Sequence, residues 1–227
     1  MVNDYYLVGT AGVDVSIFPS ILPSANKNIP WYLTNTAEII PNDRMPQIKE
    51  RQFIIEKDAD IDRKEIELGD RLTSSDSLNI FSEKALNIFK QKLDLGEYDK
   101  YEITVNTDKT IVKKYFLVNF KNLVAIDEDK SKLRKYSDNT IATVSELVFD
   151  NKALSDAPDF VKSKILPYEL YASNKVVEVV LDHKLLNFSF VGPYNGETYS
   201  PNNVIQFPKK NPDGTLDDLS PSINLIN

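Results

Sequence analysis

The sequence predicts an α+β protein whose sheet is mixed or largely antiparallel and whose two principal helices lie at about 82–93 and 173–185. Segments rich in β-branched and aromatic residues occur in runs, and the two helical patterns fall between these runs instead of alternating with single strands. Hydrophobic residues make up 41% of the 227 residues, which is enough for a packed core. No boundary between domains is evident, so we expect a single domain over 1–227.

Prolines concentrate at both ends of the chain. Each proline lacks an N–H donor and restricts the residue before it, which disfavours helices and central strands. We therefore expect a proline-rich N-terminal segment, 1–50, and a proline-rich tail, 193–227, packed on the domain or extending from it. Inside and just after the first segment, the extended stretches 31–40 and 47–55 are separated by the turn signal Pro41-Asn42-Asp43, which predicts a hairpin or meander.

The first helix is expected to begin after Ser82, whose side-chain oxygen can accept a hydrogen bond from the first turn. Glu83 adds a negative charge near the positive end of the helix dipole. Gly96 is expected to end the helix. Three apolar residues share one helical face by their spacing: Leu86, Phe89 and Leu93.

Four later segments are expected to be strands. The first, 101–105, alternates and is rich in β-formers, whereas 115–120 is apolar on both faces and should be central in its sheet. The third is 140–149. The fourth, 187–191, is expected to end at Gly192-Pro193.

The second helix is predicted by its similarity to the first. Residues 172–180 can be laid on 81–89 so that Ser173 coincides with Ser82, Lys175 with Lys84, and the apolar positions match. Each segment is followed by a short polar turn and a strand. On its own, 176–181 could be a strand or a helix, and the parallel favours a helix. The similarity also suggests a repeated strand–helix unit.

Composition excludes several kinds of chemistry. The net charge of −7 argues against a general nucleic-acid binder, and the absence of cysteine excludes thiolate metal sites and cysteine nucleophiles. The only histidine, His183, lies near the end of the second helix, where a structural role is expected. No phosphate-binding glycine motif or nucleophile elbow is present.

With no signal peptide or apolar span in the sequence, we expect a cytoplasmic protein without a cofactor or membrane partner.

Two acidic runs are the candidate partner-binding sites. The first, Asp58, Asp60 and Asp62, begins like a calcium loop, but Arg63 stands where that loop requires Gly and Gly69 where it requires Glu. A solvated acidic surface that could dock a basic partner is the favoured interpretation.

The second run, Asp127, Glu128 and Asp129, follows an apolar segment. It too is expected to be a surface loop, although like-charged neighbours could in principle hold magnesium or shift a pKa.

Three stretches together resemble a family of bacterial immunity proteins from polymorphic toxin systems, first outlined around a myxobacterial protein. They cover about 70–192 and comprise Asp70-Arg71-Leu72-Thr73-Ser74-Ser75 leading into Phe81-Ser82-Glu83-Lys84-Ala85-Leu86; Tyr115-Phe116-Leu117-Val118-Asn119-Phe120 with Leu123-Val124-Ala125-Ile126-Asp127; and Glu146-Leu147-Val148-Phe149-Asp150, followed by Ala172-Ser173 and a helix. The chain departs from the family pattern at Asn174, where Glu usually follows Ser, and at 187–190, which lacks the usual Gly.

The resemblance implies a cytoplasmic, non-catalytic protein that binds and neutralises a cognate toxin, as a monomer or homodimer. An acidic inhibitor would associate faster with a basic toxin because their electrostatic potentials are complementary. Two alternatives stay open: a structural or scaffold homo-oligomer, and a metal-dependent hydrolase that uses scattered carboxylates.

Overall fold

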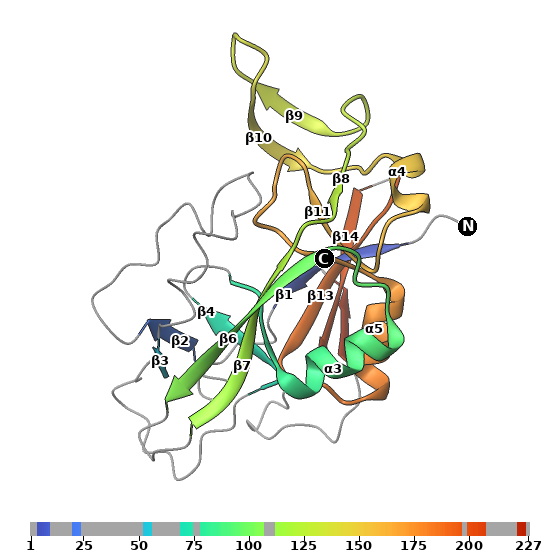
Figure 1. Cartoon of the computed structure of the whole chain (residues 1–227). Helices are drawn as coiled ribbons and strands as arrows, with labels where there is room; N and C mark the ends of the chain where they lie inside the picture. The colour runs from blue at the N-terminus through green and yellow to red at the C-terminus, as the bar shows by residue number, and fades with distance from the viewer. Residues whose placement is uncertain are drawn as a thin grey trace.

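The computed structural model describes residues 4–9, 20–23, 52–55, 69–74, 78–106, 112–196, 199–207 and 222–225 (Figure 1). Three helices and mixed, mostly antiparallel sheets lie within these ranges, which confirms the predicted α+β class. The predicted stretch 31–40, the turn at 41–43 and most of 47–55 lie outside them, as does most of both proline-rich ends.

The larger sheet has seven strands. They are β1 (Tyr5–Gly9), β8 (Leu123–Val124), β11 (Phe160–Ser163), β12 (Tyr171–Ser173), β13 (Phe188–Tyr194), β14 (Tyr199–Phe207) and β15 (Ser222–Leu225). Their spatial order is β15-β14-β13-β1-β12-β11-β8, and only the pair β11–β8 is parallel. The strand predicted at 187–191 is confirmed as β13, but it runs through Gly192-Pro193 instead of ending there, because this edge continues to pair with β14.

A second sheet of six strands closes on itself. It contains β2 (Ser20–Pro23), β3 (Gln52–Ile55), β4 (Arg71–Ser74), β5 (Ile80–Ser82), β6 (Tyr98–Asn106) and β7 (Val112–Phe120). The order is β2-β3-β6-β7-β5-β4, with β2 and β4 closing the ring. The strand predicted at 115–120 is central, as expected, because β7 pairs with both β5 and β6.

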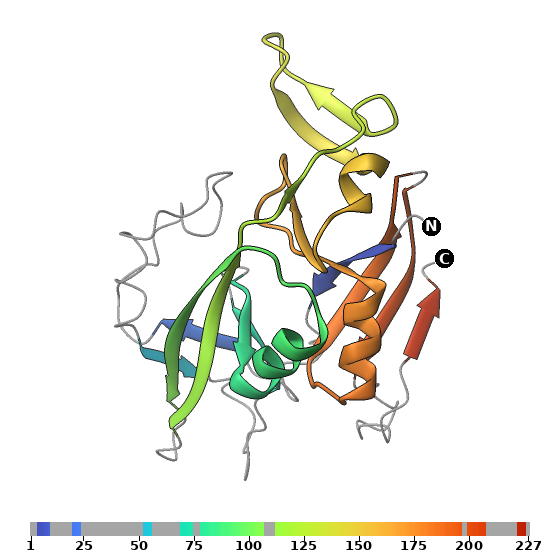
Figure 2. The ribbon, with the colours of Figure 1, turned by 45° about the vertical axis from the view of Figure 1, so that its right-hand side comes forward.

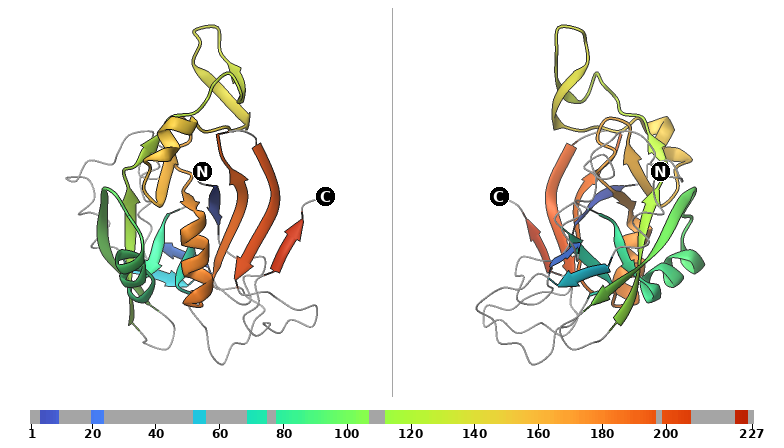
Figure 3. Two further views of the ribbon diagram at one scale, coloured as in Figure 1. Left: turned by 90° about the vertical axis from the view of Figure 1, so that its right-hand side faces the viewer. Right: turned by 60° about the vertical axis from the view of Figure 1, so that its left-hand side comes forward.

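Both predicted helices are confirmed, as α3 (Glu83–Lys92) and α5 (Asn174–Asp182). They lie side by side; α3 contacts β5 and β7 of the closed sheet, and α5 contacts β12 of the larger sheet (Figures 2 and 3). The prediction that Gly96 ends the first helix is wrong: the backbone is already extended at Leu93, and Gly96, with φ of 57°, shapes the turn before β6. The short helix α4 (Asn151–Ser155) was not predicted; Asp150 caps it by accepting from the N–H of Ala153 at 2.8 Å.

The main core lies where the two helices meet both sheets, and phenylalanine rings dominate it. Phe120 and Phe160 stack with ring centroids 4.6 Å apart, and Phe89 meets Phe160 edge-on at 5.3 Å. Phe81 stacks on Phe188 at 6.0 Å. Because these rings come from five different elements, a few aromatic contacts join both sheets to α3.

Two equivalent units build this core. Unit 1 comprises β1, β4, β5, α3 and β6, and unit 2 comprises β7, β11, β12, α5 and β13. In both, the strand before the helix ends in a serine at the N-cap position, Ser82 or Ser173. The serine hydroxyl donates to an aspartate, Asp70 at 2.7 Å in unit 1 and Asp159 at 2.5 Å in unit 2. The repeated strand–helix unit suggested by the sequence therefore extends to the hydrogen bonds around each helix start.

The two units exchange their first strands. β1 lies between β12 and β13 of unit 2, and β7 lies between β5 and β6 of unit 1. The registers correspond, because Tyr5 stands opposite Ser173 and Tyr115 opposite Ser82. Tyr5 donates to the carbonyl of Pro158 at 2.9 Å and Tyr115 to that of Gly69 at 3.0 Å, in each case the residue before the other unit's aspartate.

The aspartates join the units in the reverse direction. Asp70 donates its N–H to the carbonyl of Leu186 at 2.9 Å and accepts from the Leu186 N–H at 3.0 Å, just before β13. Asp159 makes the same pair of bonds with Asp94, just before β6, both at 2.8 Å. Each aspartate thus accepts from the N-cap serine of its own unit and also holds the segment that follows the other unit's helix. These bonds interlock the two units.

Candidate functional site

The feature that stands outside the interlocked core is a two-stranded hairpin of β9 (Lys132–Lys135) and β10 (Ile141–Glu146). It pairs with neither of the larger sheets in the described ranges and projects from the body (Figures 1 and 2). We call residues 127–146 the arm. Within the segment predicted as the strand 140–149, only 141–146 form β10. An isolated two-stranded hairpin is marginally stable in water, so the arm depends on its attachment.

A buried serine fixes the base of the arm. The hydroxyl of Ser131 donates to the carbonyl of Asp127 at 2.7 Å and accepts from the N–H of Val148 at 3.0 Å. Lys130 reaches across to the carbonyl of Gly196 at 2.9 Å. These bonds tie the two ends of the arm to each other and to the segment after β13.

The tip of the arm is an ordered turn. Asp138 accepts from both the N–H and the hydroxyl of Thr140, at 3.0 and 2.6 Å, and these bonds lower the pKa of the Asp138 carboxyl. Asn139 adopts a positive φ of 65°, which Asn tolerates better than most residues. Next to this turn, Tyr136 is 60% exposed, the most exposed large hydrophobic side chain in the described ranges. An ordered turn thus presents an aromatic side chain to solvent.

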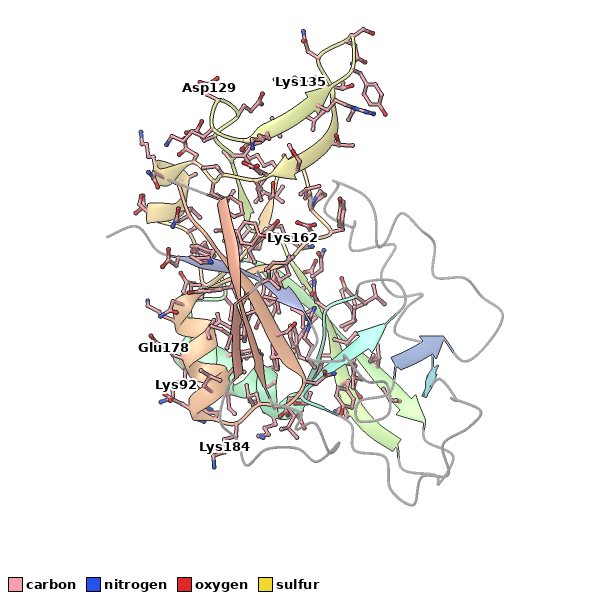
Figure 4. All side chains as sticks on the ribbon, turned by 180° about the vertical axis from the view of Figure 1, so that it is seen from behind. Lys92, Asp129, Lys135, Lys162, Glu178 and Lys184 are labelled. Atoms are coloured by element: carbon pink, nitrogen blue, oxygen red, sulfur yellow. The ribbon has the colours of Figure 1, made fainter. Side chains whose placement is uncertain are left out.

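The acidic run at 127–129 forms the loop that leads into β9. Asp127 pairs with Lys130 at 3.2 Å; partial burial tends to raise the pKa of Asp127, but the hydrogen bonds and charge of Lys130 lower it overall. Glu128 pairs with Lys135 at 2.7 Å. Asp129 is exposed and forms no ion pair with any described residue (Figure 4). Of the three predicted residues, Asp129 therefore has the carboxylate most available to a partner.

The arm also carries cations. Lys132 pairs with Glu146 across the hairpin, whereas the exposed Arg134 forms no ion pair within the described residues. Tyr136, Arg134 and Asp129 are groups of the kind that dominate protein interfaces or steer association. Asp129 was predicted from the sequence, whereas Arg134 and Tyr136 were not, because nothing in the sequence indicates that they lie on a projecting turn.

The other sequence-based expectations fare differently. Asp58, Asp60 and Asp62 lie outside the described residues, so their role stays a prediction. His183 is the exposed C-cap residue of α5. In the described ranges, no three His, Asp or Glu side chains form a group that could hold a metal ion. None of the helices described has the length and apolar character needed to cross a membrane.

Neither the scan against protein-family models nor the search of curated proteins finds a match for the chain.

Proposed function

We propose that this is a non-catalytic cytoplasmic immunity protein that binds a cognate toxin domain through its arm. The observation that carries the proposal is the arm itself, a hairpin that lies outside the interlocked core and is held at its base by Ser131. It has an exposed Tyr136 at its tip, and its Asp129 forms no ion pair with any described residue. Tyrosine contributes a large contact area with little loss of conformational entropy, which suits it to anchor an interface.

The resemblance to the immunity family supports the same proposal. The stretches that carry it correspond to α3 with its Ser82-Glu83 start, to β7, and to α5 with its Ser173 start. These elements belong to the interlocked units. Of the residues that carry the resemblance, only Asp127 and Glu146 lie in the arm, at its two ends, so the resemblance concerns mainly the scaffold. The partner-binding residues would then lie on the segments that connect the helices and strands of the units, where the arm is inserted.

The chemistry of the arm indicates what the toxin surface offers. Asp129 fits a lysine or arginine, as expected of a basic toxin, and Tyr136 fits a pocket with an apolar wall. The paired carboxylates Asp127 and Glu128 contribute less attraction, because Lys130 and Lys135 already neutralise them. Asp58, Asp60 and Asp62 are proposed as a second acidic contact on the sequence pattern alone.

The test is to express the product of a neighbouring gene that is toxic in the same host, alone and together with this protein. Growth restored by co-expression, with a stoichiometric complex recovered, supports the proposal. Continued toxicity, with both proteins present and no complex, contradicts it.

Variants of the arm then test the interface. Tyr136→Ala is expected to weaken toxin binding about 30-fold, the cost of a typical hot-spot residue. Asp129→Ala should weaken binding less and make affinity less sensitive to salt. Lys92→Ala is the matched control, because Lys92 is exposed on α3 at the end of the molecule away from the arm (Figure 4). Equal affinity for all three variants would remove the arm from the interface.

A further inference from the structure

A buried arginine that has no counter-ion among the described residues lies inside the scaffold. Arg71, on β4, is 7% exposed, and its Nε and Nη1 atoms have no hydrogen-bond partner in the described part of the chain. Its Nη2 makes one long hydrogen bond, 3.4 Å, to the Oδ1 atom of Asn79. No carboxylate among the described residues forms an ion pair with it, and burial lowers the pKa of Arg71 to about 10. A buried charge in this condition normally destabilises a protein.

Unit 2 shows how the same position is filled without a charge. Arg71 stands opposite Phe81 in the β4–β5 register, just as Phe160 stands opposite Ala172 in β11–β12. Phe160 is fully buried and stacks within the aromatic core. The backbone of this unit therefore accommodates an apolar side chain at this point, and the cation in unit 1 is not required by the fold.

The residues around Arg71 also differ from their equivalents in unit 2, because they are polar where unit 2 has apolar residues. Asn79 accepts at its carbonyl from the N–H of Val118, as Leu170 accepts from that of Val8, so the two are equivalent. Asn187 follows Leu186 as Leu95 follows Asp94, and its Nδ2 donates to the carbonyl of Arg71 at 2.8 Å. Arg71, Asn79 and Asn187 are all buried, and the Oδ1 atom of Asn187 also has no partner in the described ranges. Three polar side chains thus replace three apolar ones, namely Phe160, Leu170 and Leu95.

We propose that Arg71 is the anchor of a binding site for a small monocarboxylate. A guanidinium recognises a carboxylate through paired N–H donors, and two of the three nitrogens of Arg71 have no partner within the part of the chain that the structure describes. One carboxylate balances its single positive charge, whereas a phosphate dianion would leave a net negative charge buried. Both unpaired nitrogen atoms are almost inaccessible, so a small molecule fits better than the side chain of a large partner.

The test compares thermal unfolding of the full-length protein in sodium acetate and in sodium chloride of equal ionic strength. Acetate is expected to raise the melting temperature above the chloride value, with an increment that grows with concentration as expected for a ligand of the native state. Arg71→Met should abolish the difference between acetate and chloride. Arg134→Gln, which removes an exposed arginine of the arm, is the matched control and should retain it.

Inorganic phosphate is the third salt to be compared, and it should stabilise the protein less than acetate does. A larger effect of phosphate would overturn the carboxylate assignment. An equal acetate effect in wild type and Arg71→Met, or none in wild type, would overturn the site. Should Arg71→Met fail to fold, the Nε–H resonance of Arg71 in the wild-type protein decides: it shifts with acetate and not with chloride if the site exists, and an unchanged resonance overturns it.

Discussion

The interlocked core and the arm differ in where their polar groups find partners. In the core, Asp70 and Asp159 are buried, and each is held by bonds to both units, over sequence separations of up to 116 residues. In the arm, the ion pairs are local and largely exposed, and Tyr136 faces solvent. Buried, multiply bonded carboxylates stabilise a fold, whereas exposed pairs contribute little. The chain therefore separates the residues that maintain its structure from those available for binding.

The largest expected effect is on the two aspartates. Asp70→Ala and Asp159→Ala each leave a serine hydroxyl and a backbone N–H without their acceptor, so each should lower the free energy of unfolding by about 3–5 kcal/mol. Urea denaturation checks this, with the exposed Asp182→Ala on α5 as control. A large loss of unfolding free energy in only one of the two variants would show that the units are not equivalent.

The serines should give a smaller effect that separates the units. Ser82 donates to Asp70 and also accepts from the N–H of Ala85 at 3.0 Å, whereas Ser173 makes no such capping bond to its helix. Ser82→Ala should therefore cost about 1 kcal/mol more than Ser173→Ala, the usual value of an N-cap bond. Equal losses in urea denaturation would show that the cap of α3 contributes nothing of its own.

Much of this core could be predicted from local sequence, and the rest could not for a physical reason. A short polar side chain before a helical apolar spacing locates the starts of α3 and α5, because caps and periodicity act within one turn. The partners of Asp70 and Asp159 are set by tertiary structure, and no local pattern identifies them. One overlooked signal was available: Tyr5-Tyr6-Leu7-Val8 resembles Tyr115-Phe116-Leu117-Val118, the first strands of the two units.

The candidate site was predictable only in part. The exposure of Glu128 and Asp129 follows from their charge, whereas Asp127 is half-buried. Which of them keeps a free carboxylate depends on the hairpin, because its closure brings Lys135 to Glu128. Tyr136 carries no local signal of exposure, because its exposure depends on the turn at 137–140, which no pattern in the sequence predicted.

A smaller, pH-dependent effect is expected at Lys162, which lies on β11 and donates to the Oδ1 atom of Asn119 at 3.0 Å (Figure 4). Burial lowers its pKa from 10.5 to about 8. Between these values the unfolded chain binds more protons than the folded one, so stability rises with pH. Relative to Lys162→Met, the wild type should gain about 1 kcal/mol between pH 7.5 and 9.0. A pH-independent difference between the two proteins would contradict this.

The smallest effect on stability is expected in the arm. Tyr136→Ala and Asp129→Ala remove exposed side chains that the core does not use, so each should change the free energy of unfolding by less than about 0.5 kcal/mol. Urea denaturation beside Asp70→Ala provides the comparison. A loss comparable to that of the aspartate would mean that the arm is part of the stable core.

The most direct test of the division between scaffold and binding arm is amide hydrogen exchange, measured on the protein alone and in complex with its toxin domain. We expect new protection concentrated at 127–146, with the strands around Asp70 and Asp159 exchanging as slowly in the free protein as in the complex. Protection gained on α3 and α5 while the arm exchanges unchanged would contradict it.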